Sequence, residues 1–184
     1  MAGLIPPTAE AFITRLRNLC EAGRSFPAPV IGRMSGWTLG GGLEVAICCD
    51  LRIASTDSHY GMPEVAVGVP SVIHAALLPR LIGTSRASWL LVSGEPVDAA
   101  TALDWGLVHE LHAPEALDAR IAQLAKKLAG LGPAVMRQQK RLLREWESLT
   151  PDAAIASTVP EFGRAFATGE PQRYMRAFIE RKRG

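Results

Sequence analysis

Hydrophobic and polar positions in the first half of the chain follow helix-like and strand-like patterns in turn. Apolar residues recur at spacings of three and four over residues 8–23, which predicts an amphipathic helix with Thr8 as its N-cap. Shorter apolar runs punctuated by glycine predict, in chain order, a strand at 30–34, a turn at 36–42, a buried helix at 43–49 and strands at 51–54 and 59–61. This order of strand, glycine turn, helix and strand is typical of an α/β fold.

The second half of the chain is predicted to be mostly helical. Apolar spacing and proline positions predict helices at 71–82, 85–93, 98–105, 115–128, 133–149, 151–164 and 169–184. A short apolar run at 107–111 predicts an edge strand among them. We therefore place a boundary near residue 113, which divides a partial α/β core, residues 1–113, from a helical region, residues 114–184.

Composition and charge exclude several classes of protein. The 184 residues are 48% hydrophobic and 21% charged, which excludes disordered and collagen-like chains. The formal net charge is only +2, so we expect no nucleic-acid partner. The longest apolar stretches fall far short of the roughly 20 residues that cross a bilayer, and the N-terminus lacks a signal-peptide pattern. We therefore expect a soluble protein with no membrane partner.

The cysteines are few, and their number is odd. Cys20, Cys48 and Cys49 fit a chain that works in a reducing cytoplasm. The adjacent Cys48 and Cys49 cannot readily bond to one another or present two ligands to one metal as a C-x-x-C pair does. We therefore expect a cytoplasmic protein without a metal site.

The segment Ser35–Glu44 holds the first candidate for chemistry. Three consecutive glycines, at positions 40–42, follow a predicted strand and precede a buried helix, so backbone N–H groups would face a developing negative charge. A tight turn with close packing is the structural alternative. Glu44 lies in the first turn of this apolar helix, where partial burial would raise the pKa of its carboxyl. Its structural alternative is an acid stabilised by the helix dipole.

Glu64 is the second candidate, because one helix, one strand and one return separate it from Glu44. Both carboxylates can then reach the same end of a sheet. Two carboxylates beside an oxyanion site suit the addition of water next to a carbonyl: one takes a proton from water, and the other delivers a proton to the α carbon. Taken alone, Glu64 is typical of a surface turn. The G-x-S-x-G, P-loop, H-E-x-x-H and complete G-x-G-x-x-G motifs are all absent from the sequence.

These residues carry a resemblance to a known family. The segments 36–44, 49–54, 60–64, 78–83 and 99–108, in this order and spacing, resemble the enoyl-CoA hydratase/isomerase (crotonase) family, and 166–170 and 177–183 are similar to its C-terminus. The resemblance covers nearly the whole chain from Ala28 onward. It implies a crotonase-like ββα spiral core, residues 1–113, and a C-terminal helical region, residues 114–184, that forms a homotrimer or a hexamer.

The resemblance also implies an activity and a site. The activity is syn addition of water to a 2-enoyl-CoA, with coenzyme A as part of the substrate and no separate cofactor. Gly41 would supply an oxyanion N–H group, while Glu44 and Glu64 would share the acid and base work. The substrate-binding residues would be Trp37, Leu39, Gly40, Pro63, Val67 and Ile73. Isomerisation of a 3-enoyl-CoA to a 2-enoyl-CoA, with one carboxylate as the proton shuttle, is the alternative activity.

The chain also departs from the family pattern. An early segment that supplies the second oxyanion N–H in family members has no counterpart here, so we expect a truncated chain. A truncated, weakly active or non-catalytic fragment that binds or assembles is therefore a further alternative, and it would leave a sheet edge and apolar surface exposed. Residues 69–77 also depart from the paired glycine of many members. His74 within them is interpreted as a packed histidine, with a third catalytic group as the alternative.

Overall fold

The computed structural model describes residues 3–183, with Arg183 described by its backbone alone. The chain forms two compact units. The first unit contains residues 30–125 and the chain up to Phe26, and the second contains residues 126–184 with Pro27–Pro29. Among the described residues, no helix is long and apolar enough to cross a membrane.

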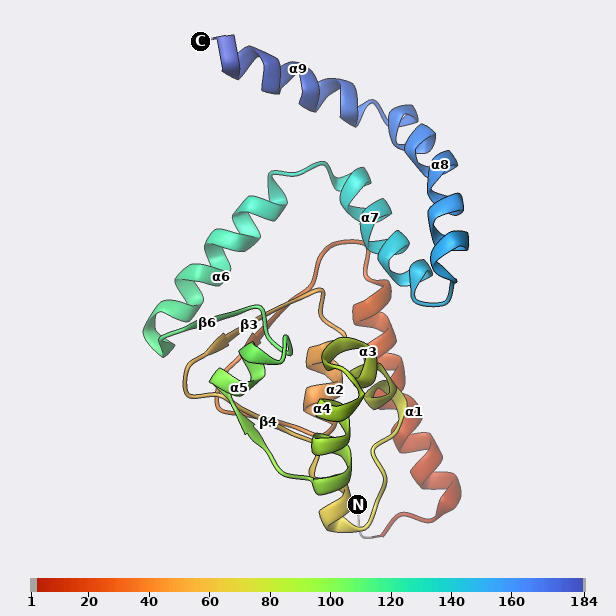
Figure 1. Ribbon diagram of the computed structural model, residues 1–184, viewed down its shortest axis with the longest axis vertical. Coiled ribbons are helices and arrows are strands. Elements are labelled where there is room, and N and C mark those ends of the chain that lie inside the picture. The colour runs from red at the N-terminus through yellow and green to blue at the C-terminus, as the bar shows by residue number, and fades with distance from the viewer. Residues whose placement is uncertain (1–2, 184) are drawn as a thin grey trace. The chain divides into compact units, whose positions relative to one another are not determined.

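Two small sheets form the frame of the first unit (Figure 1). One has the strand order β1-β3-β6 and is parallel throughout; the other has the order β2-β4-β5, in which β5 is antiparallel to β4. The strands are β1 Ile31–Met34, β2 Trp37–Leu39, β3 Leu51–Ser55, β4 His59–Gly61, β5 Val97–Asp98 and β6 Glu110–His112. Ile31 is paired with Leu51 in the first sheet, and Trp37 with His59 in the second. Both β1 and β2 are edge strands of their sheets.

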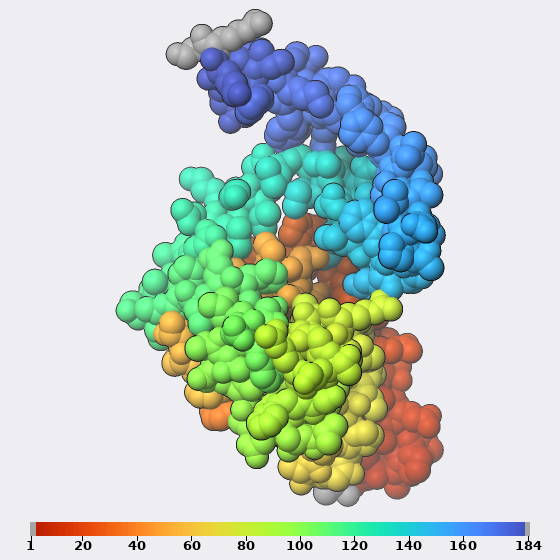
Figure 2. Space-filling view, in the orientation of Figure 1, coloured from red at the N-terminus to blue at the C-terminus, as the bar shows by residue number. Residues whose placement is uncertain are grey.

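Helical segments cover these sheets. They are α1 Pro6–Ser25, α2 Gly41–Ile47, the 3₁₀ helices η1 Pro63–Val67 and η2 Ile73–Leu77, α3 Leu78–Ile82, α4 Thr84–Ser88, the π-helical η3 Trp89–Ser93 and α5 Ala99–Asp104. Residues 63–93 form one continuous surface of the first unit, yellow to yellow-green in Figure 2. The Asp98 carboxylate accepts the Thr101 N–H at 2.8 Å and caps α5, which explains where that helix begins.

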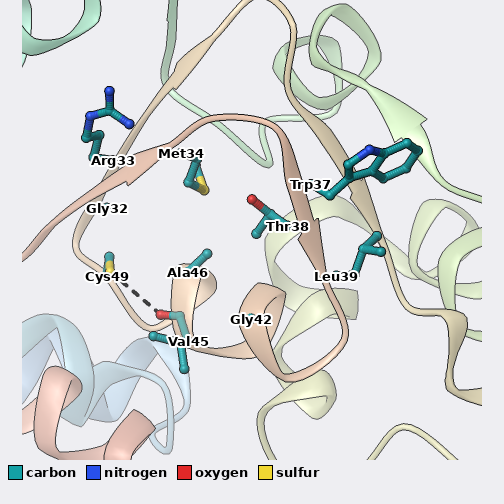
Figure 3. A pocket seen from close by; sticks show the side chains of 10 residues that line it. All are labelled: Gly32, Arg33, Met34, Trp37, Thr38, Leu39, Gly42, Val45, Ala46 and Cys49. Carbon is teal, nitrogen blue, oxygen red and sulfur yellow. Dashed lines mark hydrogen bonds between the residues drawn. The ribbon is translucent and has the colours of Figure 1, made fainter.

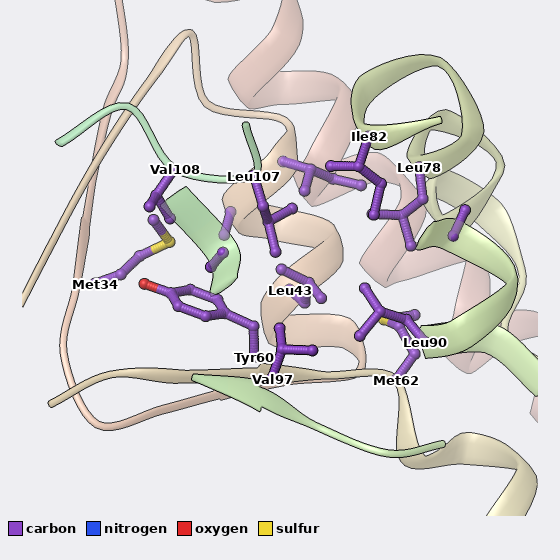
Figure 4. Close-up of a cluster of buried hydrophobic side chains, with 14 of the residues drawn as sticks. Met34, Leu43, Tyr60, Met62, Leu78, Ile82, Leu90, Val97, Leu107 and Val108 are labelled. Carbon is purple, nitrogen blue, oxygen red and sulfur yellow. The ribbon is translucent and has the colours of Figure 1, made fainter. Parts of the chain in front are cut away.

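The core of the first unit lies between the sheets and the helices. Side chains from β4, α2 and the segments after η2 converge there (Figure 4). The fully buried members include Leu43, Tyr60, Leu78, Leu90 and Leu107. The Tyr60 hydroxyl is hydrogen-bonded to Ser58 Oγ at 2.8 Å, so the one polar atom of this ring is satisfied. This core holds the segments that carry the predicted site.

The second unit is helical. Its elements are α6 Pro114–Ala129, which starts in the first unit, α7 Pro133–Trp146, α8 Pro151–Ala167 and α9 Glu170–Arg183. Glu161 of α8 is buried and binds Gln138 and Arg141 of α7, as well as Arg164 one turn further along α8. Glu170 caps the start of α7 by accepting the N–H groups of Ala134 and Val135 at 3.0 and 2.9 Å.

Several local predictions were wrong in detail. Thr8 is not the N-cap of the first helix, because the helix begins at Pro6 with Ile5 as its N-cap, and the Thr8 hydroxyl accepts the Ile5 N–H at 3.0 Å. Residues 37–39 form the strand β2 rather than part of a turn, since they pair with β4. The segment 71–82 is two helices, η2 and α3, and 85–93 changes from α to π geometry. The edge strand lies at 110–112 instead of 107–111, because Leu107 and Val108 are buried in the core.

Candidate active site

The glycine segment becomes a sharp turn from β2 into α2. Gly40 adopts φ 52° and ψ −125°, a conformation that side chains rarely tolerate, and its N–H donates to Gly61 O at 2.9 Å. Gly41 begins the helix, and a Cβ there would lie 2.7 Å from Leu16 Cδ2 of α1. The first N–H groups of a helix have no acceptor within it, so the Gly41 N–H is available to a ligand oxygen. The close packing expected of these glycines is therefore present at Gly40 and Gly41, and the oxyanion role of Gly41 stays a prediction.

Glu44 lies in the first turn of α2 and is 3% exposed. Its Oε1 accepts the backbone N–H of Ala75, in η2, at 3.0 Å. Burial raises the pKa of this carboxyl to about 7, and the nearby charge of Glu64 adds to the rise, against the opposite effect of the Ala75 hydrogen bond. A carboxyl with this pKa exchanges protons readily at neutral pH, as a general acid or base must.

Glu64 is half-buried and lies in η1, which begins at Pro63. Its Oε2 accepts the Ser71 hydroxyl at 3.1 Å. The same carboxylate lies against Gly40, since a Cβ added there would overlap Glu64 Oε1 and lie 3.2 Å from Cδ. Glu64 therefore lies beside the turn that begins α2, and Glu44 lies one turn into that helix. The structure thus brings the two predicted carboxylates to the same end of α2.

The predicted substrate-binding residues lie in three places. Trp37, on β2, is 64% exposed and stacks on His59 with ring centroids 4.5 Å apart. Leu39 ends β2 beside Gly40, and its Cδ2 lies close over Gly61. Pro63 and Val67 lie with Glu64 on η1, where Val67 is 69% exposed. Ile73 begins η2, the segment whose next residues hold Glu44.

Ile73 has a strained backbone. Its φ of 42° is positive, which is unfavourable for a β-branched residue. Strain of this kind typically costs about 1–3 kcal/mol and persists only where the surroundings impose it. Two residues later the Ala75 N–H meets Glu44, so this turn directs η2 toward the buried carboxylate.

A cavity of about 440 Å³ opens beside β2. Figure 3 shows its lining, which comes from β1, β2 and α2 together with Cys49 and includes Trp37, Thr38 and Leu39. Neither Glu44 nor Glu64 lines this cavity. It therefore shares β2 and α2 with the carboxylate site without being the place where the carboxylates act.

Two partners of the carboxylates were not predicted from the sequence. Ser71 and the N–H of Ala75 both come from the segment 69–77, which departs from the family pattern. The departure of residues 69–77 from the family pattern was the signal in the sequence that could have pointed to these partners. The His74 side chain, by contrast, is hydrogen-bonded through Nε2 to Glu21 Oε1, on α1, at 2.8 Å. His74 is also buried, which agrees with its interpretation as a packed histidine.

Comparison with known proteins places the chain in a family. A family model described as enoyl-CoA hydratase/isomerase matches residues 6–184. The chain belongs to the enoyl-CoA hydratase/isomerase family. The fold agrees, because the crystal structure of an enoyl-CoA hydratase from Mycobacterium smegmatis superimposes with a TM-score of 0.93 at 27% identity, over 98% of this chain and 70% of that one.

Relatives within the enoyl-CoA hydratase/isomerase family point the same way. A crotonyl-CoA hydratase of Syntrophomonas wolfei is 35% identical over 156 residues, 84% of this chain and 60% of that protein. A short-chain-enoyl-CoA hydratase of Clostridium acetobutylicum is 33% identical over 156 residues, again 84% of this chain and 60% of that protein. The chain therefore spans about 60% of the length of these curated relatives.

Proposed function

We propose that this chain carries the reaction centre of an enoyl-CoA hydratase, which adds water to a 2-enoyl-CoA thioester. The observation that carries the proposal is the placement of Glu44 and Glu64 at one end of α2. Glu44 is buried with a pKa of about 7. Glu64 is hydrogen-bonded to Ser71 and lies beside Gly40. The names of the relatives support the same reaction.

The reaction needs two proton transfers on one face of the double bond. One carboxylate takes a proton from water as the water oxygen bonds to C3, and the electron pair of the double bond moves to the thioester oxygen as an enolate. The other group, protonated, gives its proton to C2 as the enolate collapses. Syn addition requires both groups on the same side of the substrate, and the clustering of Glu44 and Glu64 supports this.

The enolate oxygen is the place where negative charge develops. We propose that the Gly41 N–H at the start of α2 donates to it, since that group has no acceptor within its helix. Exposed apolar side chains next to Glu64, among them Val65 and Val67, offer a surface for the acyl chain. Coenzyme A enters as part of the substrate, and this chemistry calls for no separate cofactor.

Glu44→Gln and Glu64→Gln test the proposal against its main alternative. Hydration by paired carboxylates predicts that each substitution lowers kcat by roughly 10²–10⁴-fold with a short 2-enoyl-CoA. Isomerisation of a 3-enoyl-CoA needs only one carboxylate, so one variant would then keep its turnover. One variant with intact hydration would refute the hydratase proposal.

The proposal includes turnover by this 184-residue chain on its own. That turnover needs a separate test, because the relatives that the chain matches are longer proteins. Acyl-CoA binding without measurable hydration would favour the alternative of a fragment that binds or assembles. An assay of binding beside turnover on the same preparation separates these outcomes.

We also propose that the chain assembles as a homotrimer or hexamer. The support is an apolar face on α8, where Ile155, Val159 and Phe162 recur at helical spacing and are 68%, 75% and 71% exposed. Light scattering at micromolar concentration should give the mass of a trimer or its multiple, and a monomer would refute the assembly. We propose a cytoplasmic location, which fits the presence of three cysteines of which none forms a disulfide.

A further inference from the structure

Three residues with metal-binding side chains meet at a place that the proposed reaction does not use. Cys20 lies on α1, Cys48 is the C-cap of α2 and His74 lies on η2; they are 1%, 6% and 7% exposed. One ligand atom from each lies within 4.8 Å of the other two. Figure 1 shows α1 and α2 side by side, which brings Cys20 and Cys48 together although they are distant in sequence.

The two ring nitrogens of His74 are in different situations. Nε2 is hydrogen-bonded to Glu21 Oε1 at 2.8 Å. Nδ1 is buried and has no hydrogen-bond partner within residues 3–183. A buried nitrogen without a partner is costly in a protein interior. Metal-binding histidines are commonly arranged this way, with one nitrogen bonded to a carboxylate and the other free to ligate.

We propose that Cys20, Cys48 and His74 bind one Zn²⁺ ion. Two thiolates and a neutral imidazole form a donor set that zinc favours, and a water molecule would take the fourth tetrahedral position. Tetrahedral zinc with bonds of about 2.3 Å to sulfur and about 2.1 Å to nitrogen puts its ligand atoms roughly 3.5–3.8 Å apart, so small side-chain movements close the site. The charge also fits, because two thiolates neutralise a divalent cation and a buried neutral cluster avoids an unpaired charge.

The adjacent Cys48 and Cys49, which are too close in sequence to form a ligand pair, are not paired in the structure. Cys48 is hydrogen-bonded to Cys20 instead, while the Cys49 thiol donates to Val45 O at 3.6 Å and lines the cavity of Figure 3. Cys49 therefore serves as a matched control within the same chain.

The site would connect three elements around the carboxylate centre. An ion bound to Cys20, Cys48 and His74 would link α1, the end of α2 and η2. Ala75, the next residue after His74, holds Glu44 through its N–H. The ion would thus have a structural role. Zinc binding should raise the Tm for unfolding of the first unit, and this Tm should increase with the zinc concentration.

The experiment is a titration of reduced, metal-free protein with Co²⁺, followed by absorbance. Co²⁺ replaces zinc in tetrahedral thiolate sites and gives a thiolate-to-metal charge-transfer band. We expect the band to saturate at one equivalent per chain and to disappear when Zn²⁺ is added. Cys20→Ala and Cys48→Ala should each weaken Co²⁺ binding at least tenfold, whereas Cys49→Ala should bind as the unaltered protein does.

Two further measurements keep the result unambiguous. Circular dichroism of each variant in the presence of EDTA identifies a variant that has failed to fold. Glu21→Gln leaves all three ligands in place but weakens the orientation of His74, so Co²⁺ binding should fall roughly 10–100-fold. The proposal is overturned if the unaltered protein gives no charge-transfer band, or if the band survives in both Cys20→Ala and Cys48→Ala. None of these readouts depends on hydratase activity.

Discussion

The buried carboxyl of Glu44 makes the stability of the protein depend on pH in a predictable direction. Glu44→Gln keeps the size of the side chain and an oxygen that can accept the Ala75 N–H, now at 3.0 Å, but it removes the ionisable group. The substitution should therefore stabilise the fold above neutral pH while it lowers the kcat of the proposed hydration by roughly 10²–10⁴-fold. Opposite effects on stability and activity are expected where a buried group is retained for its chemistry.

The magnitude follows from the pKa. Below pH 4.5 the folded and unfolded states both hold the proton of Glu44, and the carboxyl costs no stability. As the pH rises through 4.5 the unfolded state ionises first, so stability falls until the folded state ionises at about pH 7. A rise of the pKa from 4.5 to about 7 corresponds to about 3 kcal/mol, at about 1.4 kcal/mol per unit. Glu44→Gln removes this cost.

Urea unfolding at a series of pH values between 4 and 9 measures the effect. The free energy of unfolding of Glu44→Gln minus that of the unaltered protein should be near zero at pH 4 and approach about 3 kcal/mol above pH 8. Glu95→Gln is the control, because Glu95 is exposed and lies outside the site. A difference for Glu44→Gln that does not change with pH would refute the assignment of the raised pKa to this carboxyl.

Three further predictions concern the packing around the site and the second unit. Gly40→Ala should destabilise the fold by about 1–3 kcal/mol in urea unfolding, because Gly40 has a positive φ. The added Cβ would also overlap the Glu64 carboxylate and displace it, with a loss of turnover. Gly42→Ala is the control: its added Cβ meets nothing within 4 Å, so stability should change by less than about 1 kcal/mol. Ser71→Ala should lower kcat about tenfold through loss of the bond to Glu64, and an unchanged kcat would show that this bond does not orient the carboxylate. Glu161→Gln should lower the Tm measured by circular dichroism by a few degrees, since it weakens the links between α7 and α8, and an unchanged Tm would contradict that role.

The local elements and the two carboxylates were accessible from the sequence. Amphipathic spacing marks α1 and the later helices, and the runs around β1, β3 and β4 mark strands, because the side-chain period of each element is a property of nearby residues. Glu44 was also predicted to be partly buried with a raised pKa, since it interrupts an apolar helix. The structure agrees that burial raises the pKa of Glu44, and it adds a second contribution from the nearby charge of Glu64.

What local patterns missed depends on partners far along the chain. Residues 37–39 look like part of a glycine turn, and they become a strand only because β4 pairs with them. Ser71 and Ala75 have no periodic signature. They matter because the segment that leads into η2 passes Glu64, and η2 itself passes Glu44.

The group of Cys20, Cys48 and His74 shows the same distinction most clearly. In the sequence the nearest pair of cysteines is Cys48 and Cys49, but adjacent side chains diverge. Cys20 and His74 reach Cys48 only because α1, α2 and η2 pack together. Sequence spacing determines which way each element presents its side chains, whereas the burial of apolar faces against one another determines which elements meet.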